Sequence, residues 1–206
     1  MTSKVNLVWV TPEAEEKIAF MARVSNPANQ DNPETAPKLL KYLINNNHWS
    51  PFEMVNVCME IETTRDIARQ ILRHRSFSFQ EFSQRYAVAD EFSISEPRMQ
   101  DTKNRQNSLE TDDYFVKTWW DAAQKRAISD ASQLYNQALE QGIAKEQARK
   151  LLPEGLTMSR MYMNGTLRSW IHYCNIRCDK ATQKEHREVA DKCKKIIMDL
   201  FPSLME

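Results

Sequence analysis

Glycine is scarce in this chain, with only Gly142, Gly155 and Gly165 among 206 residues. The two common glycine-rich phosphate-binding loops, G-x-x-x-x-G-K and G-x-G-x-x-G, need several glycines within one short run. The three glycines are too far apart to form either loop. A nucleotide bound by this protein must therefore be held by side chains.

The chain also lacks an excess of charge and a long apolar run. It carries 28 basic and 28 acidic side chains, so its formal net charge is zero. A protein dedicated to duplex nucleic acid usually has a basic excess, so nucleic acid is disfavoured as the main partner. We expect no signal peptide, and the sequence has no apolar span of membrane length. We expect no membrane partner and a cytoplasmic location, or the host cytoplasm for a viral protein.

No C-x-x-C pair occurs among the four cysteines, which are Cys58, Cys174, Cys178 and Cys193. Cys174 and Cys178 are one helical turn apart and His172 lies nearby, which leaves a zinc site as one alternative. Structural zinc sites have tighter ligand spacings, and free cysteine is commonly buried as a small apolar residue. We therefore expect buried thiols in a reducing compartment and no bound metal.

Hydrophobic patterning predicts a mixed fold. Residues Lys4–Val10 and Val55–Glu62 have the composition of strands, and the second alternates apolar and polar side chains. Several segments have apolar stripes at helical spacing, whereas Met158–Met163 is compatible with a strand or a helical turn. A very polar segment at about 95–113 is expected to be a surface insertion. The whole chain, 1–206, is predicted to be a single helix-rich α+β domain with a small sheet.

Capping residues indicate where the helices begin. Thr11, Thr35 and Thr64 each precede an apolar helical stripe, and we expect them at helix starts. Asn164 is expected to cap a later helix, and Thr182–Glu185 has the spacing of a capping box for the final one.

Arginine is concentrated on one predicted helix. Arg65, Arg69 and Arg73 are spaced four apart and are expected to form one outward stripe. Like charges at this spacing repel by roughly a few tenths of a kcal/mol per pair, so an anion or an acidic partner would relieve them. The alternative is a solvated helix face, the common arrangement for such a run.

The stripe continues into a loop rich in hydrogen-bond donors. Between Arg69 and Tyr86 the chain has four arginines, one histidine and three serines. The planar guanidinium group matches phosphate oxygens, so this density predicts an anion site. Phe77, Phe79 and Phe82 are either core residues or the wall of a pocket for a planar ligand.

One spacing in this loop resembles a known signature. Arg73–His74–Arg75 is followed after seven residues by Ser83, and this R-H-R-x7-S pattern resembles that of flavin-dependent thymidylate synthases. Other blocks resemble the same family and occur in the same order: Ala22–Ser25, His48–Glu53, Ala148–Pro153, Arg168–Ser169, and Asn175–Arg177 with Gln183 and Glu185. The blocks span residues 22 to 185, so the resemblance covers nearly the whole chain.

The resemblance implies a fold and a reaction. The fold is a helix-rich domain with a small, mostly antiparallel sheet and several long helices, assembled as a homotetramer with FAD and dUMP in clefts shared between subunits. The implied reaction passes the methylene of 5,10-methylenetetrahydrofolate to C5 of dUMP and reduces it with a hydride carried by FAD. NADPH reloads the flavin, and dTMP and tetrahydrofolate are the products. The missing glycine fingerprint agrees with this family, which binds FAD without a Rossmann βαβ unit.

The resemblance also implies residue roles. The implied FAD contacts are Ser25, His48, Ser50, Arg73, His74, Arg75 and Glu81. The implied dUMP contacts are Gln70, Arg73, Glu81, Ser83, Gln84, Arg85, Arg149 and Arg177. Arg177 matches the catalytic arginine that activates the uracil ring. A guanidinium against the N3/O2 edge stabilises negative charge there and makes C5 more nucleophilic.

The chain departs from the family pattern at two positions. Gln84 stands where relatives often have glycine, and Ala181 stands where some have a histidine. The first departure could alter the loop geometry, and the second removes a possible flavin contact. Two other functions are carried as alternatives: a single-stranded nucleic-acid-binding module that uses the arginine stripe, and a flavin-binding homologue that lacks methyl transfer.

Overall fold

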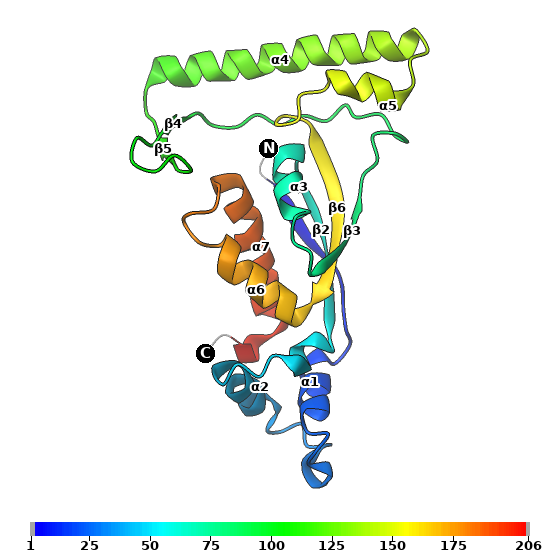
Figure 1. Ribbon diagram of the computed structural model, residues 1–206, viewed down its shortest axis with the longest axis vertical. Helices are drawn as coiled ribbons and strands as arrows, with labels where there is room; N and C mark the ends of the chain where they lie inside the picture. The colour runs from blue at the N-terminus through cyan, green and yellow to red at the C-terminus, as the bar shows by residue number, and fades with distance from the viewer. Residues whose placement is uncertain (1–2, 205–206) are drawn as a thin grey trace.

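A four-stranded antiparallel sheet forms the middle of an elongated molecule in the computed structural model, which describes residues 3–204 (Figure 1). Its order is β1-β2-β6-β3, with bounds Lys4–Val10, Asn56–Thr64, Met158–Thr166 and Phe77–Glu81. All three strand pairs are antiparallel. The predicted class, a helix-rich α+β fold with a small antiparallel sheet, is confirmed, and Met158–Met163 belongs to a strand.

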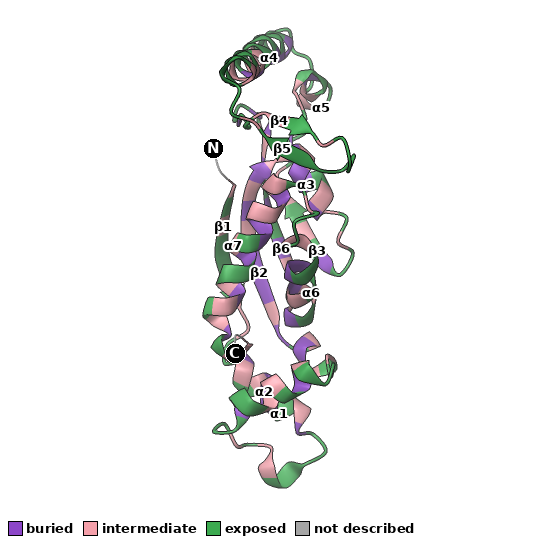
Figure 2. Ribbon diagram, turned by 90° about the vertical axis from the view of Figure 1, so that its left-hand side faces the viewer, coloured by how far each residue is buried: buried purple, intermediate pink, exposed green. Residues whose placement is uncertain are grey.

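Three helices cover one face of this sheet, namely α3 (Arg65–Ile71), α6 (Leu167–Arg177) and α7 (Lys184–Leu200). The core lies between them and the sheet (Figure 2). Apolar residues pair across β2 and β6, with Met59 opposite Met163. Trp170 of α6 is fully buried, and its indole N–H donates to the carbonyl of Val57 at 2.9 Å. Each such large side chain contributes roughly 1.5–3 kcal/mol by its burial.

The remaining elements lie at the two ends of the molecule. Helices α1 (Ala14–Ala22) and α2 (Ala36–Asn45) form one end, and α4 (Tyr114–Glu140) with α5 (Lys145–Ala148) forms the other. A hairpin of β4 (Arg98–Gln100) and β5 (Ser108–Glu110) lies within the segment expected to be a surface insertion. Short 3-10 turns occur at Pro27–Asn29, Ser50–Glu53, Arg149–Leu151 and Pro202–Leu204. No helix in the described part of the chain is long and apolar enough to cross a membrane.

Thr35 and Thr64 stand at the helix starts predicted for them, as the N-cap residues of α2 and α3, whereas α1 begins after Glu13 and not at Thr11. None of the three hydroxyl groups caps a helix, because each has another partner. The Thr35 hydroxyl accepts a bond from buried Arg23 at 2.6 Å, and the Thr11 hydroxyl accepts from the Asn56 amide at 2.9 Å. Thr64 does precede α3, but its hydroxyl donates to Asp66 and caps no backbone N–H.

The last two predicted helix starts are also shifted. Asn164 belongs to β6, and the cap of α6 is Thr166, whose hydroxyl accepts from the amide of Ser169 at 3.2 Å. The capping box over Thr182–Glu185 does not form, because α7 begins after Gln183 and the Thr182 hydroxyl donates to the carbonyl of Ile176.

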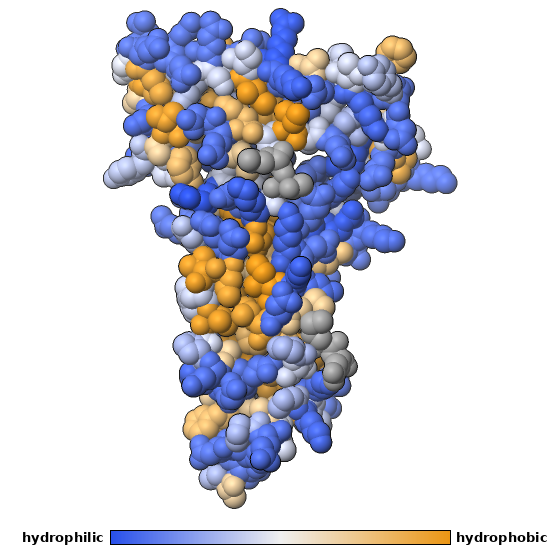
Figure 3. All heavy atoms as spheres, turned by 180° about the vertical axis from the view of Figure 1, so that it is seen from behind, coloured by the Kyte–Doolittle hydropathy of each residue, from blue (hydrophilic) through white to orange (hydrophobic). Residues whose placement is uncertain are grey.

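The β1 strand is a free edge of the sheet and carries an apolar surface. Leu7, Val8 and Trp9 are 40%, 48% and 45% exposed, at a bulge in the pairing of β1 with β2. Seen from behind, this strand lies in the apolar patch at the middle of the molecule (Figure 3). Free edges with large apolar side chains are usually covered in the working form of a protein.

Candidate functional site

The loop between α3 and β3 carries the R-H-R motif. It is short because α3 ends at Ile71 and β3 begins at Phe77, and the amide of His74 donates to the carbonyl of Ile71 at 3.0 Å. The side chains of Arg73 and Arg75 are exposed, and neither pairs with a carboxylate within residues 3–204. The loop therefore presents two uncompensated guanidinium groups, which is the chemistry of an anion site.

Arg177 meets this loop from a distant part of the chain. Its Nε–H donates to Nε2 of His74 at 2.9 Å, across 103 residues. Because Nε2 accepts this bond, the imidazole is neutral and carries its proton on Nδ1. Burial, the Arg177 guanidinium and His172 lower the pKa of His74 from its ordinary 6.5 to about 4. The predicted catalytic arginine and the predicted flavin histidine are thus direct neighbours.

The sheet topology explains this meeting. Strands β2 and β6 are antiparallel, so α3 starts beside the beginning of β6 and α6 starts beside the beginning of β2. The two helices therefore leave opposite ends of the sheet on the same face, and their C-terminal ends approach each other. The His74 ring packs edge-on against Tyr173 of α6, with a centroid separation of 5.0 Å.

Glu81 lies at the end of β3 and is held by two side chains. The Ser159 hydroxyl donates to its carboxylate at 2.8 Å, and Nη1 of Arg65 lies 3.6 Å from the same oxygen. This contact corrects the prediction of an outward arginine stripe. Arg65 is buried and also pairs with Glu154, which pairs with Arg69 at 3.0 Å. Only Arg73 of the three arginines is left without a carboxylate.

The predicted phosphate contacts lie beyond β3, towards α5. Ser83 and Arg85 are exposed, and Nε of Arg85 lies 3.3 Å from the Glu146 carboxylate. Nε of Arg149 donates to the backbone carbonyl of the same Glu146 at 3.3 Å. An exposed ion pair of this kind contributes at most about 1 kcal/mol, so an incoming phosphate can replace Glu146 as the partner of Arg85.

Gln84 turns away from this surface. Its side chain is buried, and its amide nitrogen has no hydrogen-bond partner among the described residues. The side chain that replaces the usual glycine is therefore accommodated in the interior, and only the backbone at this position can contact a ligand.

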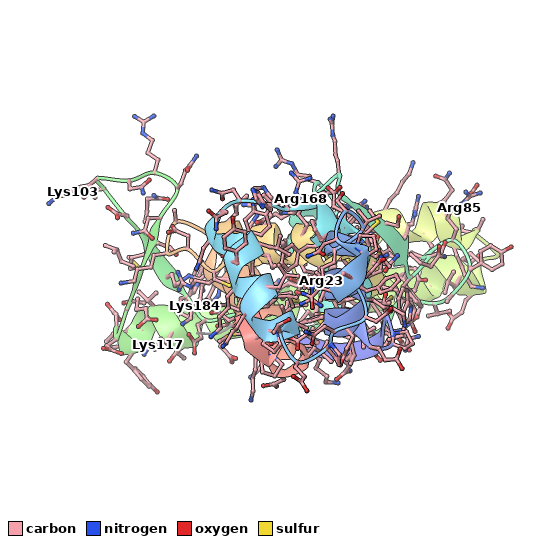
Figure 4. The ribbon with its side chains drawn as sticks, turned by 90° about the horizontal axis from the view of Figure 1, so that it is seen from below. Arg23, Arg85, Lys103, Lys117, Arg168 and Lys184 are labelled. Carbon is pink, nitrogen blue, oxygen red and sulfur yellow. The ribbon has the colours of Figure 1, made fainter. Side chains whose placement is uncertain are left out.

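Three predicted flavin contacts lie far from Arg85 and Arg149, on segments that follow α1 and α2, and two of them flank Trp49, which shares a cleft with Ser76 of the R-H-R loop. Ser25 follows α1, His48 follows α2, and Ser50 begins a 3-10 turn, all exposed. They lie with α1 and α2, whereas Arg85 projects beside α5 (Figure 4). A single chain therefore does not bring all of the predicted site residues together.

A cleft of about 380 Å³ adjoins the R-H-R loop, and the predicted residue roles did not include it. Its walls include Trp49, Ser76, Arg168, Ser169, His172 and Asn175. Arg168, which is paired with Glu53, projects from the surface in Figure 4. An aromatic wall with a few placed donors is typical of a site for a planar ligand that also carries phosphate. The motif blocks His48–Glu53 and Arg168–Ser169 were the signal for this cleft.

The cysteines offer no alternative chemistry at the site. Burial and neighbouring Cys178 raise the pKa of Cys174 from 9.0 to about 12, so this thiol stays protonated at neutral pH. All four cysteines are free. Within residues 3–204, no group of three or more potential ligands is placed to hold a metal ion.

Comparison with known proteins gives consistent matches. A family profile described as thymidylate synthase complementing protein matches residues 6–203. The flavin-dependent thymidylate synthase of Synechocystis sp. is 56% identical over 190 residues, covering 92% of this chain and 87% of that protein. A probable flavin-dependent thymidylate synthase of Paramecium bursaria Chlorella virus 1 is 52% identical over 192 residues, covering 93% of this chain and 88% of the viral protein.

A solved structure shares the same architecture. The UMP/dUMP methylase PolB from Streptomyces cacaoi, bound with 5-Br dUMP, aligns with a TM-score of 0.86 and 25% sequence identity. The alignment covers 98% of this chain and 92% of that chain.

Half-buried His74 and fully buried His186 predict how stability depends on pH. The pKa values of His74 and His186 are both lowered to about 4, in each case chiefly by burial, whereas the unfolded chain titrates near 6.5. Between these values the unfolded state binds more protons, so the free energy of unfolding should rise with pH from about 4 to 6.5 and then level off. Urea unfolding across this range measures the slope, which should be smaller in His186→Asn. An unchanged slope in that variant would assign the effect to other groups.

Proposed function

This chain belongs to the flavin-dependent thymidylate synthase family, and on that premise we propose that it reductively methylates dUMP to dTMP. In this reaction 5,10-methylenetetrahydrofolate donates the methylene carbon, and FAD is the hydride carrier. NADPH is the reductant, dUMP loses its C5 proton, and tetrahydrofolate is released. The observation that carries the proposal is the contact of Arg177 with neutral His74, beside the unpaired Arg73 and Arg75.

Arg177 activates the nucleotide in this proposal. His74 accepts the bond from Nε. The two terminal nitrogens of the guanidinium have no hydrogen-bond partner within residues 3–204 and can face the N3/O2 edge of uracil. Positive charge at that edge stabilises the negative charge that develops as C5 becomes nucleophilic. No enzyme nucleophile is needed, which agrees with the protonated thiol of Cys174.

The donors around the cleft fit FAD. Arg73 and Arg75 supply positive charge for a pyrophosphate, Arg168 can join them by leaving its ion pair with Glu53, and Trp49 supplies an apolar wall for a ring. We assign FAD to Ser25, His48, Ser50, Arg73, His74, Arg75 and Glu81, with Arg168 added. When bound, FAD supplies the hydride that completes the methyl group. Ser159 and Arg65 both contact the same oxygen of Glu81, so its other carboxylate oxygen is left for the assigned ligands.

The nucleotide takes the other side of the loop. We assign dUMP to Gln70, Arg73, Glu81, Ser83, Gln84, Arg85, Arg149 and Arg177, with Gln84 acting through its backbone. Arg85 and Arg149 already meet at Glu146, and a phosphate between them would gain two charge-assisted partners.

The four unbridged cysteines fit a reducing compartment, and we place the reaction in the cytoplasm, or in the host cytoplasm for a viral protein.

Two features support a homotetramer with sites at subunit interfaces. The assigned residues fall at separate ends of one chain, and the 380 Å³ cleft has room for only part of a dinucleotide such as FAD. The exposed Leu7, Val8 and Trp9 on the free edge β1 offer an apolar surface for a second copy.

Substitution of Arg177 tests the assigned activity. The wild-type protein should be yellow, should oxidise NADPH in a dUMP-dependent way, and should form dTMP once the folate is supplied. Arg177→Ala should lower kcat by about 10²–10³-fold, because one charge-stabilising donor is lost, while the FAD content stays the same. Arg126→Ala, on the exposed surface of α4, is the matched control and should match wild type. Near-normal turnover in Arg177→Ala would assign activation to another residue, and a yellow wild type without dTMP formation would indicate a flavoprotein that lacks methyl transfer.

A charge on the β1 edge tests the assembly. Val8→Lys should reduce the mass found by light scattering from four chains towards one, because an unpaired ammonium group is costly at a buried interface. Leu109→Lys places the same charge on the β4–β5 hairpin, at a residue of similar exposure, and should leave the mass unchanged. A Val8→Lys protein that stays tetrameric would exclude this edge as the contact.

A further inference from the structure

His186 is a fully buried polar residue whose role the reaction leaves open. It lies on α7 and is 0% exposed. Its Nδ1 lies 3.2 Å from Oε1 of Gln70 on α3, and its Nε2 lies 3.2 Å from the hydroxyl of Tyr173 on α6. The imidazole therefore joins the three helices that cover the sheet, and one of its two partners is an assigned dUMP contact.

The direction of each hydrogen bond in this network can be derived from its charged end. The Glu185 carboxylate only accepts, and Arg98 of β4 holds it with two bonds of 2.7 Å. Nε2 of Gln183 donates to that carboxylate at 3.0 Å, so Gln183 turns its carbonyl oxygen towards Gln70. Nε2 of Gln70 then donates to this oxygen at 2.7 Å, and the carbonyl oxygen of Gln70 faces His186.

This order fixes the tautomer of His186. Because the Gln70 oxygen only accepts, Nδ1 of His186 must carry the proton and donate it. Nε2 is then an acceptor and takes the bond from the Tyr173 hydroxyl. Donors therefore point in one direction from Tyr173 to Glu185, and every polar atom of the imidazole is satisfied.

The surroundings of His186 favour a neutral ring. The groups that face it are Gln70 from α3, Tyr173 and Arg177 from α6, and His74 from the loop. The nearest charge among them is the Arg177 guanidinium, which disfavours a second cation. Together with burial and His74, it lowers the pKa of His186 to about 4. The donor–acceptor pattern therefore persists throughout the neutral pH range.

From this network we propose that His186 is a positioning residue for the nucleotide, because it holds the Gln70 amide in one orientation. Inside the network, Gln70 uses one N–H of its amide nitrogen and one lone pair of its carbonyl oxygen. Its second N–H and its second lone pair then point in a defined direction at the half-exposed surface of α3. A buried network in which one member is unsatisfied is costly, so rotation of the Gln70 amide would leave a donor facing the donor of His186. The proposal rests on the proposed function, in which Gln70 contacts dUMP.

Two isosteric variants separate the two bonds of the imidazole. His186→Asn places an amide nitrogen at the position of Nδ1 and retains the donor to Gln70, but it loses the acceptor for Tyr173. His186→Gln reaches the position of Nε2 and retains the contact with Tyr173, but it loses the donor to Gln70. The two side chains have the same functional group, so they differ chiefly in which hydrogen bond they preserve.

Two quantities are measured. The first is the dUMP affinity of the FAD-loaded protein, obtained from the change in flavin absorbance when dUMP is titrated in. The second is the KM for each substrate. His186→Gln should weaken dUMP binding and raise the KM for dUMP by about tenfold. This is the effect expected when one hydrogen bond between neutral groups is lost and the Gln70 carbonyl oxygen is left without that donor. The FAD content and the KM for the folate should stay at wild-type values. His186→Asn should bind dUMP within about threefold of wild type, and Gln70→Ala sets the largest effect that the network can produce.

Tyr173→Phe provides an independent arm, because it removes only the hydroxyl and keeps the ring against His74. It should lower the melting temperature and leave dUMP affinity within about threefold of wild type. Equal dUMP affinity in the wild type, His186→Asn and His186→Gln would overturn the proposal. Equally weak binding in the two variants would also overturn it, because it would indicate that His186 acts through packing. If wild type itself neither binds dUMP nor forms dTMP, the proposed function fails first, and the two failures are distinguishable.

Discussion

The contact between Arg177 and His74 depends on a neutral imidazole, and much of the central fold serves to keep it neutral. A guanidinium can donate to Nε2 only when that nitrogen is unprotonated. Burial under α6 and the charge of Arg177 lower the pKa of His74 to about 4, so this condition holds at physiological pH. Arg177 lies in the last turn of α6, where a cation is also favoured by the helix dipole. The antiparallel pairing of β2 with β6 brings the ends of α3 and α6 together on one face.

In the proposed function, the residues around this contact divide into those that bind ligands and the one that activates the nucleotide. The R-H-R loop presents two guanidinium groups, Arg73 and Arg75, without acidic partners among the described residues, whereas Arg65 is buried and paired with Glu81 and Glu154. Arginines in one short stretch of sequence thus have different roles, according to whether a carboxylate lies near. The paired arginine supports the fold and orients Glu81, and the unpaired arginines remain available for phosphate groups.

The sequence predicted the fold class and the motif residues better than it predicted their partners. The alternation in β2 and the order of the motif blocks depend on local patterns; the structure has the strand, and the matching family profile confirms the family. Thr35 is at the predicted helix start, but the hydroxyls of Thr11 and Thr35 do not cap a helix, because they bond to residues far away or on another element. The burial of Arg65 and the bonds of His186 also depend on tertiary contacts, with partners 13 to 116 residues away. No local pattern carries that information, and the cleft lined by Trp49 and Arg168 arises in the same way.

The central claim is that the methyl group of dTMP receives its hydride from a flavin bound beside Arg177. The most direct test uses the purified holoprotein with its flavin reduced in advance, without oxygen and without NADPH. Addition of dUMP and 5,10-methylenetetrahydrofolate should return the flavin absorbance to the oxidised form and yield dTMP in an amount equimolar with the bound flavin. A flavin that stays reduced while dTMP accumulates, or equal dTMP formation by flavin-free protein, would contradict the account.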